Sequence, residues 1–112
     1  MFEVCNINQN EDSMRYYEEI ESLLYSAFNK GKKLCKLYSC NAEILEYEYM
    51  GILALVSYGT PIAVCTLYDS SLYDCLRVVY GYSATSSQHI AKFRKWLAEN
   101  NYSVQQFVRF TN

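Results

Sequence analysis

The spacing of hydrophobic residues predicts a helix over residues 13–30. Its apolar side chains recur at steps of three and four residues, which is the period of one helix face: Met14, Tyr17, Ile20, Leu24, Ala27 and Phe28. Asp12 or Ser13 can cap the start by accepting backbone N–H bonds. Lys30 suits the negative end of the helix dipole, and Gly31 predicts a left-handed residue that closes the helix.

From residue 34 the period changes to that of strands. Residues 52–58 are almost continuously apolar, as is typical of a central strand covered on both faces. Gly59 and Thr60 predict a type II′ hairpin turn, and Pro61 opens the next strand, 62–68. A third strand follows over 72–82, so that three strands form an antiparallel meander. Weaker patterns at 2–7, 34–39, 42–49 and 102–110 allow further short strands.

A second helix is predicted to begin near residue 85. Thr85 and Gln88 match the S/T-x-x-E/Q capping box. An apolar stripe follows, and the helix ends near Glu99: Ile90, Phe93, Trp96 and Leu97. The sum is an α+β fold with an N-terminal helix, a three- to four-stranded antiparallel sheet and a C-terminal helix packed on it, with both helices on one face.

Length and composition set the class. A chain of 112 residues that is 51% hydrophobic and 20% charged fits one globular domain, residues 1–112. It contains no run of about 20 apolar residues for a membrane helix, and its start lacks the features of a signal peptide. Its five cysteines form no C-x-x-C pair and are expected to stay reduced. We expect a cytoplasmic protein with no metal site and no cofactor.

One candidate binding surface lies in the predicted strand 42–49. Its residues are Glu43, Glu46, Tyr47, Glu48 and Tyr49, within a chain that holds 12 tyrosines. Tyrosine suits both half-buried sheet faces and protein interfaces. These residues therefore predict either an acidic, aromatic patch that binds a basic partner surface or the charged protection of an edge strand.

Basic residues give a second candidate surface. Lys92, Arg94 and Lys95 on the last helix, with Arg77 and Arg109, are placed to contact phosphates or simply to face solvent. The net charge is −2, so the clearly basic balance of most nucleic-acid-binding domains is missing.

Catalytic motifs are not found. The single histidine, His89, has Ser86 and Ser87 nearby, but a capping role accounts for both serines. No cysteine lies in a motif that lowers its pKa, and no glycine-rich phosphate loop occurs. We expect His89 to anchor the start of its helix and the protein not to be an enzyme. An enzyme that uses His89 and a cysteine is the third interpretation.

Two segments carry a resemblance. Residues 57–63 read S-Y-G-T-P-I-A and residues 82–90 read Y-S-A-T-S-S-Q-H-I. They resemble the pattern S-Y-x-T-x-x-A followed by Y-S-x-T-[ST]-x-x-H-I in small proteins of bacteriophages and mobile elements of Firmicutes that share a domain of unknown function. The resemblance covers about residues 42–97. It implies a phage-encoded protein that inhibits a host defence, with an anti-CRISPR inhibitor of a Cas effector as the sharpest version.

The function expected from the sequence is therefore non-enzymatic binding to a host protein in the bacterial cytoplasm. Binding would use the residues 43 and 46–49 and act by steric occlusion. The alternative is a small nucleic-acid-binding regulatory module that uses the basic C-terminal helix. A homodimer is compatible with either.

Overall fold

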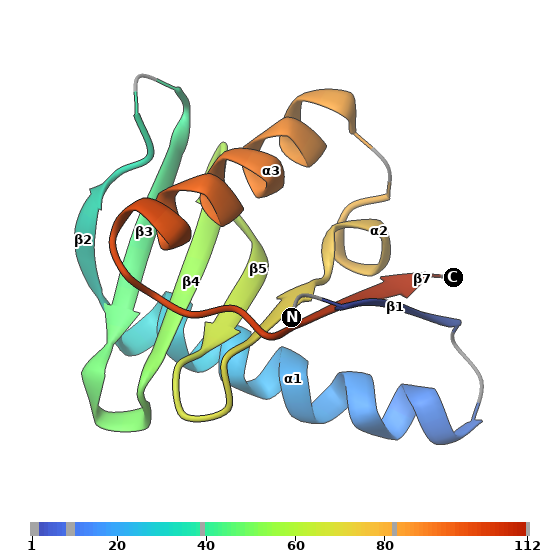
Figure 1. Ribbon diagram of the computed structural model, residues 1–112. Helices are drawn as coiled ribbons and strands as arrows, with labels where there is room; N and C mark the ends of the chain where they lie inside the picture. Colours follow the sequence, from blue (N-terminus) through green and yellow to red (C-terminus); the bar gives the residue numbers. More distant parts are fainter. Residues whose placement is uncertain (1–2, 9–10, 39, 82, 112) are drawn as a thin grey trace.

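The computed structural model describes residues 3–8, 11–38, 40–81 and 83–111, and shows one mixed sheet between two helices (Figure 1). The chain order is β1 (Glu3–Asn8), α1 (Glu11–Lys30), β2 (Lys32–Lys36), β3 (Ala42–Tyr47), the 3-10 turn η1 (Glu48–Met50), β4 (Ile52–Ser57), β5 (Thr60–Thr66), β6 (Ser71–Asp74), α2 (Leu76–Val79), α3 (Ala84–Glu99) and β7 (Gln106–Thr111). In this part of the chain the sheet has seven strands in the order β1-β7-β6-β5-β4-β3-β2.

The sheet combines a meander with a parallel edge. Strands β2 to β6 pair antiparallel with their neighbours in sequence. Strand β7 then lies between β1 and β6 and runs parallel to both. Helix α1 joins the two edge strands, β1 and β2. The predicted meander is confirmed, but the predicted size of three to four strands is wrong because the weaker patterns also form strands.

The two helices cover opposite faces of the sheet (Figure 1). Helix α1 contributes Tyr17, Ile20, Leu24 and Ala27 to one core, together with Ile52, Ala54 and Val64 of the sheet. Helix α3 contributes Ile90, Phe93 and Leu97 to the other, together with Leu53, Leu55 and Cys65. The prediction of both helices on one face is wrong, because side chains alternate along a strand and β4 is apolar on both sides.

Most element positions were predicted within a few residues, but the third meander strand was predicted too long. It ends at Asp74, and residues 76–79 form α2 instead of sheet. The cause is local: the Asp74 Oδ1 accepts a hydrogen bond from the Leu76 N–H at 3.0 Å, which favours a turn into helix.

Turn and cap chemistry differs from expectation at three places. Tyr58 and Gly59 have φ of 50° and 81°, which defines a type I′ turn and not the predicted II′ turn. Gly31 is not left-handed; a Cβ there would collide with the Ala27 carbonyl oxygen and lie 3.0 Å from that of Glu46. Helix α1 begins at Glu11, so Asp12 and Ser13 lie inside it and not at its cap.

The length and polarity of the helices can be compared with those of a membrane-spanning helix. Within the described ranges, every helix is too short or too polar to cross a membrane.

Candidate functional site

The structure divides the predicted acidic patch. On β3, Ala42 and Ile44 pack in the α3-side core, while Leu45 and Tyr47 pack against the α1-side core. Side-chain alternation therefore puts Glu43 and Glu46 on opposite faces. The Glu43 Oε2 forms a salt bridge with the Lys33 Nζ at 3.0 Å. Glu43 is also absent from the lining of the hollow that the other four residues share.

Those other four residues do come together. Glu46, Tyr47, Glu48 and Tyr49 line a hollow of about 260 Å³ with Lys30 and Lys32, where α1 ends and β3 leads into η1. We call this the tyrosine hollow. Tyr49 is 89% exposed, and its ring centroid lies 6.0 Å from that of Tyr47. Two lysines balance two glutamates, so the tyrosine hollow is aromatic and mixed in charge, and not acidic.

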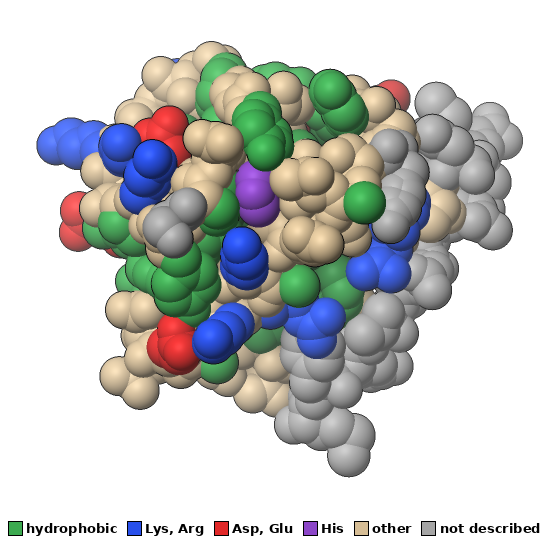
Figure 2. All heavy atoms as spheres, turned by 90° about the horizontal axis from the view of Figure 1, so that it is seen from above, with side chains coloured by type: hydrophobic (Ala, Val, Ile, Leu, Met, Phe, Trp, Pro, Cys, Tyr) green, Lys and Arg blue, Asp and Glu red, His purple; other side chains and the backbone are tan. Residues whose placement is uncertain are grey.

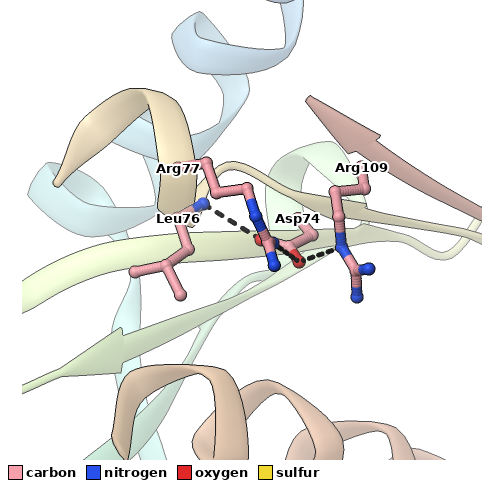
Figure 3. Close-up of polar contacts among 4 residues, drawn as sticks. All are labelled: Asp74, Leu76, Arg77 and Arg109. Carbon is pink, nitrogen blue, oxygen red and sulfur yellow. Dashed lines mark hydrogen bonds and ion pairs between the residues drawn. The ribbon is translucent and has the colours of Figure 1, made fainter. Parts of the chain in front are cut away.

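The basic candidates are also divided. Arg77 and Arg109 both point toward Asp74, whose carboxylate is buried (Figure 3). The Arg109 Nε donates to Asp74 Oδ2 at 3.0 Å, and the Arg77 Nη1 lies 3.7 Å from the same oxygen. Both arginines therefore already contact a buried carboxylate. The structure gives no support to the prediction that they contact phosphate together with the last helix.

The basic residues of α3 do not form a stripe. Lys92 and Lys95 are exposed, whereas Arg94 is half-buried with its guanidinium carbon 4.7 Å from the centre of the Phe107 ring. Seen from the α3 side, Lys and Arg side chains are dispersed among other residue types (Figure 2). The described residues of this surface therefore do not form the continuous positive track that nucleic-acid backbones favour.

A buried serine–histidine network was missed at the sequence level. The cap of α3 is Ser83, whose Oγ accepts from the Ser86 N–H at 3.3 Å, so the predicted capping box is wrong by two residues. Ser86 is thereby free to turn inward, and its Oγ lies 3.0 Å from the Ser57 Oγ. The Ser57 Oγ in turn lies 2.7 Å from the His89 Nδ1. This network ties α3 to the end of β4.

The network borders a cavity rich in hydroxyl groups. The cavity measures about 240 Å³, and seven of its eight lining residues carry a hydroxyl: Ser57, Tyr58, Thr60, Tyr80, Ser83, Thr85 and Ser86, with Ile62 as the eighth. The ring of Tyr58 lies 5.5 Å from that of His89. The edge of the imidazole, purple in Figure 2, reaches the surface although His89 is only 3% exposed.

Burial and a neighbouring lysine affect the charge of His89. Burial, and then the charge of Lys92, lower the pKa of His89, which favours the neutral imidazole that Ser57 can hydrogen-bond. Among the described contacts of His89 there is no carboxylate to complete a catalytic triad. His89 does anchor the start of its helix as expected, through a serine of β4.

Burial affects the reactivity of the described cysteine thiols. Burial, and to a lesser extent the charge of Asp69, raises the pKa of the Cys65 thiol to about 12. Burial, and to a lesser extent Asp74, also raises the pKa of the Cys75 thiol. The Cys40 thiol donates to the Leu37 carbonyl oxygen at 2.8 Å. A protonated thiol is a poor nucleophile, so among the described side chains the His89–cysteine interpretation gains no support.

The lowered pKa of His89 predicts a pH dependence of stability. Because the folded pKa lies below the ordinary value of 6.5, the unfolded chain binds more protons near and below that pH. The free energy of unfolding is therefore expected to fall as the pH drops from about 7.5 to about 5.5. Urea denaturation across this range measures it. In His89→Gln the decrease should be smaller, and an identical pH slope in both proteins would contradict the assignment.

Comparison with known proteins does not identify a family for this chain. No family model, curated protein or solved structure matches the chain.

Proposed function

We propose that this chain is a non-enzymatic binding protein that works by covering a surface of a protein partner. The observation that carries the proposal is the tyrosine hollow, where Tyr49 is 89% exposed and projects next to the partly exposed Met50. Tyrosine and methionine are enriched in the cores of protein interfaces, where they gain most by losing contact with water. Two flanking glutamates and two lysines can form the polar rim.

The nature of the partner rests on the sequence resemblance alone. Resemblance to phage and mobile-element proteins favours a host protein in the bacterial cytoplasm, with a defence protein as target. An inhibitor of a Cas effector is the sharpest version, acting by steric occlusion. The alternative, a nucleic-acid-binding module on α3, is weakened by the engagement of Arg77 and Arg109 with Asp74.

The test is capture from a host lysate with the tagged chain, with and without nuclease. The expected result is one host protein retained in stoichiometric amount after nuclease treatment. Tyr49→Ala should weaken its binding by about 30-fold or more, the effect of losing a central interface tyrosine. Tyr80→Ala is the matched control, because Tyr80 is 65% exposed but lies beside α2, away from the tyrosine hollow.

Two outcomes would contradict the proposal. Equal binding by the Tyr49→Ala and Tyr80→Ala proteins would remove the tyrosine hollow as the interface. Capture that disappears with nuclease, and that weakens steeply with salt, would favour the nucleic-acid alternative. The double variant Glu46→Lys, Glu48→Lys adds a kinetic readout, since it should slow association with a basic partner and leave association with a neutral one unchanged.

A further inference from the structure

A second cavity lies between α3 and the segment that leads into β7. It measures about 430 Å³ and is lined by Ala91, Arg94, Lys95, Ala98, Tyr102 and Val104. Small-molecule sites are typically about 300–1,000 Å³, so the volume is sufficient for a compact ligand. Its two charged lining residues are both cations, which favours an anionic group in the ligand.

The positive charge continues beyond the cavity wall. The guanidinium carbons of Arg94 and Arg109 lie 4.7 and 5.1 Å from the centre of the Phe107 ring. Arg109 contacts Asp74 through Nε, and Figure 3 shows its two terminal nitrogens pointing away from that carboxylate. Arg77 contacts the same carboxylate. One buried carboxylate thus lies against two guanidinium groups, those of Arg77 and Arg109.

A stack of aromatic rings ends at the wall of the same cavity. Phe93 stacks on Trp96 at 6.4 Å, and Trp96 stacks on Tyr102 at 5.7 Å with 19° between the ring planes. Tyr102 is a lining residue, so the stack reaches the cavity wall. Ala91 and Ala98 lie two turns apart on α3 and leave room beside it. A planar group in the ligand could extend the stack by one ring.

We propose that this cavity binds a small ligand of the mononucleotide kind, one phosphate group joined to a planar aromatic base. The phosphate contacts Arg94, with Lys95 adding positive charge, and the base lies against Tyr102. This site uses different residues from the tyrosine hollow, so it does not depend on the proposed function.

The experiment is an NMR titration of the full, isotope-labelled chain with AMP. Saturable shifts are expected at the backbone amides of Ala91, Ala98 and Tyr102, with a Kd in or below the millimolar range. Arg94→Gln should raise the Kd about tenfold or more, the cost of losing a charged hydrogen bond. Lys92→Gln removes the same charge from an exposed position on the same helix, and its Kd should stay within about twofold.

A second variant protects the test against a folding defect in Arg94→Gln. Ala98→Leu fills the cavity from an exposed helix position without changing charge, and it should abolish the AMP shifts. Four outcomes would overturn the proposal: no saturable shifts at about millimolar AMP, adenosine binding as tightly as AMP, inorganic phosphate binding as tightly as AMP, or equal weakening by Lys92→Gln and Arg94→Gln. The last would indicate a general phosphate-attracting surface of the nucleic-acid type.

Discussion

Replacing Asp74 with alanine is expected to lower the free energy of unfolding by about 3 kcal/mol. The side chain of Asp74 is 2% exposed and accepts hydrogen bonds from the Leu76 N–H and the Arg109 Nε, with Arg77 alongside. Removing the carboxylate takes away the acceptor of the Leu76 N–H and the negative charge that Arg77 and Arg109 contact. Both arginines are 29% exposed, so water relieves part of the cost and keeps it at the low end for a broken buried ion pair.

Urea denaturation of a short series measures this effect. Asp74→Asn keeps an acceptor for the Leu76 N–H and should cost less than the alanine variant. Asp69→Ala is the control for an exposed aspartate, expected to cost about 1 kcal/mol or less because the Asp69 carboxylate accepts a local hydrogen bond from the Thr66 hydroxyl. A cost for Asp74→Ala no larger than that of the control would show that the arginines do not need this carboxylate.

Replacing Phe107 with alanine is expected to cost about 3–5 kcal/mol. The ring is 1% exposed in the α3-side core, and two guanidinium groups lie against it. Truncation removes buried apolar area, leaves a void and deprives Arg94 and Arg109 of their cation–π contact.

The matched control for this second prediction is Phe28→Ala. Phe28 is 37% exposed on α1, and its removal should cost about 1 kcal/mol or less. Denaturant midpoints and slopes of the two variants give the comparison directly. Similar losses at both positions would show that the α3-side core does not depend on this ring.

The fold was predictable where the pattern is local. Both long helices follow from apolar steps of three and four residues, and β4 and β5 from continuous apolar runs. The apolar run of β4 also indicates how the layers are arranged. Residues 52–56 are apolar at every position, so both faces of this strand must be covered, and two helices on one face would leave the other face exposed. The place of β7 between β1 and β6 was not predictable, because it depends on pairings between residues far apart in the chain.

Parts of the candidate sites could also be predicted from the sequence, and other parts were missed. Tyr47 and Tyr49 were found together because they are neighbours in sequence. The separation of Glu43 from Glu46 could have been predicted from the two-residue period of a strand. The serine–histidine network could also have been found, because Ser86 and His89 continue the apolar stripe of α3 at helical spacing, and a polar residue on a buried stripe needs a polar partner. The prediction of a capping box at Thr85 gave Ser86 a role at the helix start, so its inward position was not expected.

The position of β7 has a consequence for how the protein is made. β1 is synthesised first, yet its only pairing in the described sheet is to β7, the last element. At about 5–20 residues per second, translation of the roughly 100 residues between them takes roughly 5–20 seconds. During that time β1 has no partner, and once β6 has been made its unpaired edge is also open to pairing with other chains. Pairing of these edges with other chains would then compete with folding until β7 is in place.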